Sequence, residues 1–159
     1  MGELMLWHDV ALGLLRGICI ACMGAIVLFD MTMKLIPTPL CWAMGAVGLL
    51  AQAYIGGYGS TAAGAIGACC VLVACLGVDA LAQAGKKDAG RQQLIGGGDV
   101  RCMMALALAT GPKWLPGALV CFAAASVCGL VARALGKLQP GEPFPFAPFL
   151  ALWLLIGLP

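Results

Sequence analysis

The chain reads Gly96-Gly97-Gly98-Asp99-Val100-Arg101 immediately before an apolar run from Cys102 to Thr110. Glycine adopts backbone dihedrals closed to other residues, and its missing side chain lets another group approach the backbone closely. A carboxylate at the edge of a membrane-spanning segment is costly, so an acid in this position is a candidate functional group. Asp99 is therefore the first candidate site residue, and the rest of the chain must supply a second group for it to work with.

The composition is that of a membrane protein. The chain has 159 residues, of which 62% are apolar and only 10% charged, whereas soluble domains have about 45–50% apolar and about 25% charged residues. A soluble fold of this length could not hide so much apolar surface. We therefore expect residues 1–159 to form a single domain embedded in a lipid bilayer. The net charge of +2 is too small to indicate a nucleic-acid partner.

The apolar segments predict an all-α, polytopic membrane protein of about six transmembrane helices. The predicted spans are Val10–Phe29, Leu40–Ile55, Ser60–Val78, Val100–Thr110, Leu115–Ala134 and Phe146–Leu158. The fourth is short for a crossing, so its helix is expected either to begin earlier or to start within a cavity. Residues 1–9 are predicted to form an amphipathic lead-in, because the positive region of a cleavable signal peptide is missing.

The predicted connections between spans are short turns and two polar loops. Pro37 and Pro39 stop a helix, and Gly56-Gly57 indicates a turn. The polar stretches Asp79–Leu94 and Leu135–Pro145 are predicted to be loops, the first of them exposed to solvent.

The positive charges orient these spans. An even number of spans places both termini on one side of the membrane. Seven basic residues then fall on the opposite side, namely Lys34, Lys86, Lys87, Arg91, Arg101, Arg133 and Lys137, while Arg16 and Lys113 fall towards the side of the termini. Because cytoplasmic loops carry the excess of Lys and Arg, the side with seven is expected to face the cytoplasm, with both termini outside.

This topology brings Asp30, Asp79 and Asp99 near the cytoplasmic face. Two carboxylates a few ångströms apart do not both ionise easily, so one can act as a base on water while the other acts as an acid on a carbonyl. The glycine triplet favours Asp99, whereas Asp79 has no neighbouring glycine or proline. An acid at a helix end near the headgroups is also often only an interfacial group. Arg101 does not share the helix face of Asp99, and we expect it to anchor at headgroups or cytoplasmic water.

The nine cysteines do not predict a metal site. Most lie inside apolar runs, where a free cysteine behaves as a small hydrophobic residue. Cys19 and Cys22 have CxxC spacing, but no second pair or histidine lies near them, and a metal site needs more ligands. We expect no metal and no cofactor.

Three motifs resemble those of the type IV prepilin peptidases, a family of membrane aspartyl proteases. Gly96-Gly97-Gly98-Asp99-Val100-Arg101 resembles their GxGD-x-K motif, and Asp30, followed six residues later by Ile36-Pro37, resembles their first-aspartate motif, D…R-x-IPN. Pro145-Phe146-Ala147-Pro148-Phe149-Leu150-Ala151-Leu152 resembles their last-helix signature, PFGP-F-LAL. The three motifs come in the order of the family.

The resemblance implies an aspartic endopeptidase in which Asp30 and Asp99 are the catalytic pair. The motif residues expected to support them are Gly96, Gly97, Gly98, Arg101, Pro37, Pro145, Phe146 and Pro148. The implied substrate is a prepilin or pseudopilin; a type IV pilus, a type II secretion system, a competence system and a conjugative thin pilus all stay open. The short basic leader of the substrate would be cut at the cytoplasmic face of the bacterial inner membrane.

The sequence departs from the family pattern in three places. Thr38 stands where Asn is usual, and Ala147 stands where Gly is usual. Longer members carry an insert with two CxxC pairs between the first two spans, whereas this chain has about nine residues there and no cysteine before Cys41. Since that insert is associated with zinc and with N-methylation of the trimmed pilin, we assign no methyltransferase activity.

Two other classes of function remain open at this stage. A small proton-coupled membrane transporter could use Asp30 and Asp99 as relay groups, because an acid beside broken helix backbone suits an ion site. The hydropathy, however, lacks inverted-repeat symmetry. A membrane assembly subunit without chemistry could use its Gly- and Ala-rich faces only for packing.

Overall fold

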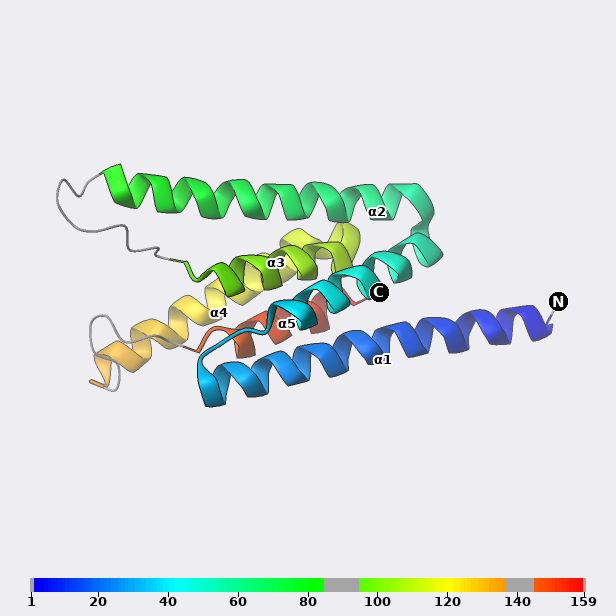
Figure 1. The fold of residues 1–159 in the computed structure, drawn as a ribbon, viewed down its shortest axis with the longest axis horizontal. Helices are drawn as coiled ribbons and strands as arrows, with labels where there is room; N and C mark the ends of the chain where they lie inside the picture. The colour runs from blue at the N-terminus through cyan, green and yellow to red at the C-terminus, as the bar shows by residue number, and fades with distance from the viewer. Residues whose placement is uncertain (1, 85–94, 137–144, 159) are drawn as a thin grey trace.

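The computed structural model describes residues 2–84, 95–136 and 145–158, and every element in them is helical. The elements are α1 (Gly2–Met33), α2 (Thr38–Ala84), α3 (Gly97–Thr110), the short 3-10 helix η1 (Gly111–Lys113), α4 (Trp114–Ala134) and α5 (Ala147–Gly157). Figure 1 shows them as one bundle. The predicted all-α class is confirmed for these residues.

Three helices in the described residues are long and apolar enough to cross a membrane. They cover Trp7–Met33, Thr38–Leu81 and Gly97–Ala134, and Ala147–Gly157 is a shorter apolar helix. The sequence predicts about six spans because it divides the second and third of these helices in two. The count of six stays a prediction, although both long helices do contain a break.

The two breaks occur at glycines. Gly57 (φ 58°, ψ −146°) interrupts α2 at the predicted Gly56-Gly57 turn, and Figure 1 shows α2 reversing direction there. Gly111 (φ 54°) ends α3. Positive φ costs glycine little because it has no Cβ. A hydrogen-bond network joins the breaks: the Ser60 hydroxyl donates to Oε1 of Gln52, whose Nε2 donates to the Ala109 carbonyl at 2.7 Å.

Several predicted boundaries were wrong. The predicted lead-in is part of α1, which begins at Gly2, and α2 continues to Ala84 where the sequence predicted a loop from Asp79. Helix α3 begins at Gly97, before the predicted Val100. Its first turn tolerates glycines because the first N–H groups of a helix have no partner within the helix. The remainders of the two predicted loops, residues 85–94 and 137–144, lie outside the described residues.

Helix α3 packs between the two halves of α2. A Cβ on Gly48, in the first half, would lie 2.4 Å from the Ala109 Cα. A Cβ on Gly64, in the second half, would lie 3.1 Å from the carbonyl oxygens of Ala107 and Leu108. Small residues let helices approach closely in lipid, where dispersion contacts replace a hydrophobic driving force. These glycines therefore fix the place of α3, which carries Asp99.

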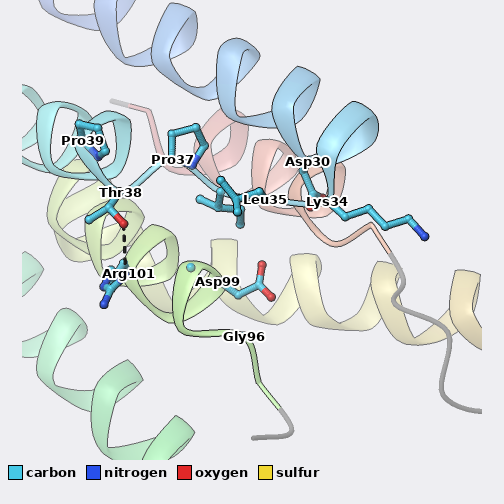
Figure 2. A pocket seen from close by; sticks show the side chains of 11 residues that line it. Asp30, Lys34, Leu35, Pro37, Thr38, Pro39, Gly96, Asp99 and Arg101 are labelled. Atoms are coloured by element: carbon cyan, nitrogen blue, oxygen red, sulfur yellow. Dashed lines mark hydrogen bonds between the residues drawn. The ribbon is translucent and has the colours of Figure 1, made fainter.

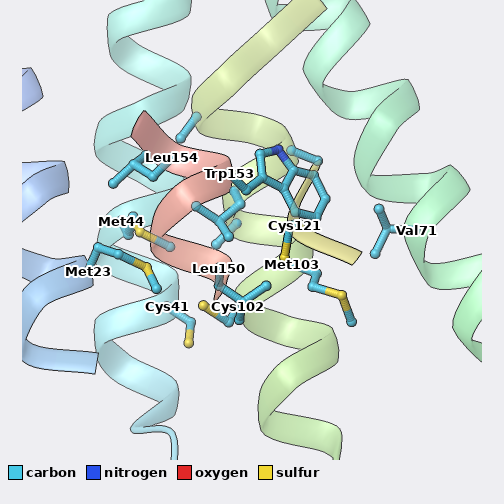
Figure 3. Close-up of a cluster of buried hydrophobic side chains, with 14 of the residues drawn as sticks. Met23, Cys41, Met44, Val71, Cys102, Met103, Cys121, Leu150, Trp153 and Leu154 are labelled. Carbon is cyan, nitrogen blue, oxygen red and sulfur yellow. The ribbon is translucent and has the colours of Figure 1, made fainter. Parts of the chain in front are cut away.

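A cluster of buried side chains from all five α-helices forms the core (Figure 3). It includes Met23 of α1, Met44 of α2, Met103 of α3, Cys121 of α4 and Trp153 of α5. The indole Nε1 of Trp153 donates to Oγ1 of Thr110 at 3.3 Å, as a buried indole N–H usually requires. Gly117 makes room for this ring, since a Cβ there would lie 2.3 Å from Cδ1 of Trp153. The core thus fixes α5 against α3 and α4.

Candidate active site

Asp30 and Asp99 line one pocket of about 540 Å³, which we call the acid pocket (Figure 2). It lies where the end of α1, the connection to α2 and the start of α3 meet. Its lining consists of Asp30, Lys34, Leu35, Ile36, Pro37, Thr38, Pro39, Gly96, Gly98, Asp99 and Arg101. The structure thereby brings together two acids that are far apart in the sequence.

Asp30 is held by the first backbone amide of α5. Its side chain is only 8% exposed, and Oδ2 accepts a hydrogen bond of 3.0 Å from the Ala147 N–H. Because that N–H lies in the first turn of a helix, it has no partner within α5. A helix N-terminus also attracts negative charge. The contact therefore fixes the direction of the Asp30 carboxyl group and ties α1 to α5.

Asp99 lies half-buried in the first turn of α3, so it too sits at a helix N-terminus. A Cβ on Gly96 would lie 3.1 Å from Oδ2 of Asp99, so any side chain at position 96 would press against the carboxyl group. Asp30 is near enough for its charge to act on Asp99. The two acids are therefore like-charged groups on the lining of one cavity.

The connection between α1 and α2 forms one wall of the pocket. Lys34 directly follows α1 with a left-handed backbone (φ 51°), and its N–H donates to the Asp30 carbonyl at 3.0 Å. The Pro37 carbonyl accepts the Leu40 N–H at 3.1 Å and so starts α2. A Cβ on Gly98 would lie 3.0 Å from the Ile36 Cβ. Gly98 therefore lets this wall pack directly on the first turn of α3.

Arg101 joins the starts of α2 and α3. Its Nη1 donates to Oγ1 of Thr38 at 3.2 Å, as the dashed line in Figure 2 shows. The sequence gives no sign that Thr38 lies opposite, and the predicted anchor of Arg101 at headgroups or cytoplasmic water stays a prediction. Arg101 is exposed and lines the acid pocket, so it brings a positive charge to the same cavity as the acids.

A family model described as the type IV leader peptidase family matches residues 17–133, well over half of the chain. The chain belongs to the type IV leader peptidase family. The match includes both Asp30 and the Gly96–Arg101 motif, and it ends before Pro145. Searches of curated proteins and of solved structures find no match. Family membership and the three long apolar helices make this leader peptidase a membrane protein.

Four predicted motif residues of this leader peptidase do not line the acid pocket. Gly97 is exposed, and a Cβ there would meet nothing within 4 Å. Pro145, Phe146 and Pro148 surround Ala147 in the sequence, and the Phe146 ring contacts Phe122 with centroids 5.8 Å apart. Within the last-helix motif it is the Ala147 N–H that contacts Asp30. Sequence reasoning missed this contact because a backbone amide leaves no side-chain signal.

Two further ionisable residues, Lys34 and Asp79, were used in the sequence analysis, and the structure shows where each lies relative to the acid pocket. Lys34 lines the pocket although the sequence used it only for orientation; its place four residues after Asp30, beside the turn, could have indicated this. Asp79 is half-buried and does not line the acid pocket. Within the described residues, no group of three or more His, Cys, Asp or Glu side chains could hold a metal ion.

Proposed function

We propose that this leader peptidase is an aspartic endopeptidase in which Asp30 and Asp99 are the catalytic pair. The observation that carries the proposal is their position on the lining of a single pocket. The pocket also reaches the exposed side chains of Lys34 and Arg101, which gives water and a peptide a route to the acids. Membership of the family supports the reaction class.

The pair would act without a nucleophilic side chain. One carboxylate accepts a proton from water as the water oxygen bonds to the peptide carbonyl carbon, and the other carboxyl group gives its proton to the carbonyl oxygen. The tetrahedral intermediate then collapses. Its nitrogen receives the proton from the first carboxyl group as the C–N bond breaks, and a hydroxyl proton returns to the second. The pair ends in its starting protonation state.

The proposed substrate is a type IV prepilin or pseudopilin, cut between its short basic leader and the apolar helix that follows. The proposed side is the cytoplasmic face of the bacterial inner membrane. Lys34 and Arg101 line the acid pocket, and α4, with Arg133 in its last turn, ends on the same side of the bundle (Figure 1). Positive charge on this side supports a cytoplasmic orientation. The connection between α1 and α2 is short, so methyltransferase activity is not proposed.

The decisive experiment is co-expression with a prepilin, with leader removal followed by the mobility of the product on a gel. Asp30→Asn and Asp99→Asn should each lower the cleavage rate by about 10³-fold or more, while the protein still inserts. The amide oxygen introduced by Asp30→Asn can still accept the Ala147 N–H, so this variant should preserve the fold. Asp79→Asn is the matched control and should cleave normally, since Asp79 does not line the acid pocket. If Asp79→Asn abolished prepilin cleavage while Asp30→Asn cleaved fully, the pairing of Asp30 with Asp99 would be refuted.

A further inference from the structure

A second, apolar pocket lies on the surface between the first half of α2 and α3. It has a volume of about 230 Å³, and we call it the apolar groove. Its lining includes Trp42, Gly45, Ala46 and Leu49 of α2 and Met104 and Leu108 of α3. Trp42, Ala46 and Leu49 are exposed, so the groove is open to an occupant from the membrane.

The apolar groove continues from the acid pocket. Arg101 lines both cavities. From there the lining extends along α2 from Cys41 to Leu49, which is about 12 Å at 1.5 Å per residue, and away from Asp99 along α3 as far as Leu108. Beyond Arg101 the lining of the groove is apolar, so a molecule that passes from one cavity to the other would go from charged to apolar surroundings within about two helical turns.

We propose that the apolar groove binds the apolar helix that follows the cleavage site of the substrate. This inference rests on the proposed function, which gives the substrate a polar leader, a scissile bond and an apolar helix in that order. The two cavities present the matching order of surroundings. Ala46 is small and exposed, so it leaves room for a helix to approach closely. A lipid chain or a second copy of the protein could occupy such a groove anywhere on the surface, and would not require that the groove continue from the acid pocket.

The test compares two substrates and two variants of α2. Ala46→Phe fills the groove from an exposed position, and Ala43→Phe adds the same ring at an exposed position of α2 outside the groove lining. One substrate is a full prepilin, and the other is a soluble peptide that ends a few residues after the cut. Ala46→Phe should raise the KM for the prepilin about tenfold with kcat unchanged, and should leave peptide cleavage unchanged. Ala43→Phe should leave both unchanged.

Three results would overturn the inference while leaving the proposed function intact. The first is that Ala46→Phe cleaves both substrates as the unmodified protein does. The second is that it loses activity equally on the prepilin and on the soluble peptide. The third is that the substitution changes only the oligomeric state of the protein. The last would assign the groove to a second copy. Cleavage of neither substrate by the unmodified protein would instead refute the proposed function. As a second measurement, a photoreactive p-benzoylphenylalanine at Leu49 should cross-link to the apolar helix of the prepilin, and a cross-link only to lipid would also overturn the inference.

Discussion

The carboxyl groups of Asp30 and Asp99 are each positioned by a contact with the backbone. The carboxyl group of Asp30 contacts a backbone amide, Ala147 N–H, and that of Asp99 lies against the bare Cα of Gly96. Neither contact depends on another ionisable side chain. We therefore expect the proposed role of the two acids to depend on the backbone around them staying in place.

Two adjacent glycines give a matched test of this backbone. Gly98→Ala should lower cleavage about tenfold or more, because its Cβ would lie 3.0 Å from the Ile36 Cβ and push the wall of the acid pocket away from α3. Overpacking of this kind costs about 1–3 kcal/mol. Gly97→Ala should cleave within about twofold of the unmodified protein, because its Cβ would meet nothing within 4 Å. The measurement is the initial rate of prepilin cleavage at equal amounts of inserted protein.

The opposite pattern, with Gly97→Ala inactive and Gly98→Ala active, would contradict this role of Gly98. Equal loss in both variants would show that the triplet serves flexibility rather than close approach. Shortening Ile36 to Ala should not rescue Gly98→Ala, since the close contact is with the Ile36 Cβ itself.

At the scale of elements, apolar runs and glycine turns predict most helices, but not their ends. Gly56-Gly57 marks the break in α2, and the span Leu115–Ala134 lies within α4. The sequence misses residues 79–84 of α2, where polar Asp79 and Gln83 indicate a loop although alanine and leucine favour a helix. The sequence does not predict the contact of Asp30 with Ala147, because side-chain periodicity carries no information about a single N–H.

The packing of α3 against α2 gives a prediction about stability. Gly48→Ala should lower the unfolding temperature in detergent by about 5 °C or more, because its Cβ would lie 2.4 Å from the Ala109 Cα, a backbone atom that cannot rotate away. Gly77→Ala, also in α2, is the control, since its Cβ would meet nothing within 4 Å. Better helix propensity should leave that variant as stable as the unmodified protein or up to about 1 kcal/mol more stable. Equal melting of the two variants would mean that α3 does not pack on Gly48.

At the scale of the whole molecule, helix lengths set the depth of the acids. Helix α4 has 21 residues, about 31 Å at 1.5 Å per residue, which matches a hydrocarbon core of about 30 Å. Helices α3 and α5 have 14 and 11 residues, about 21 and 16 Å, and Thr110 of α3 contacts Trp153 and lies beside Gly157 of α5. Asp99 and the Ala147 N–H lie in the first turns of these two shorter helices. We therefore expect the acid pair to lie below the membrane surface, with the acid pocket as its route to water.

The proposed orientation of the bundle can be tested on α4 alone, because this helix is long enough to cross a membrane and has a basic residue near each end. Lys113 precedes its first residue and Arg133 lies in its last turn, and both are exposed. With the positive side in the cytoplasm, a membrane-impermeant maleimide should label Lys113→Cys in intact spheroplasts and label Arg133→Cys only after the membrane is opened. The unmodified protein gives the background of its nine native cysteines. Labelling in the reverse order would place Asp30 and Asp99 at the outer face, where a leader that stays in the cytoplasm could not reach them.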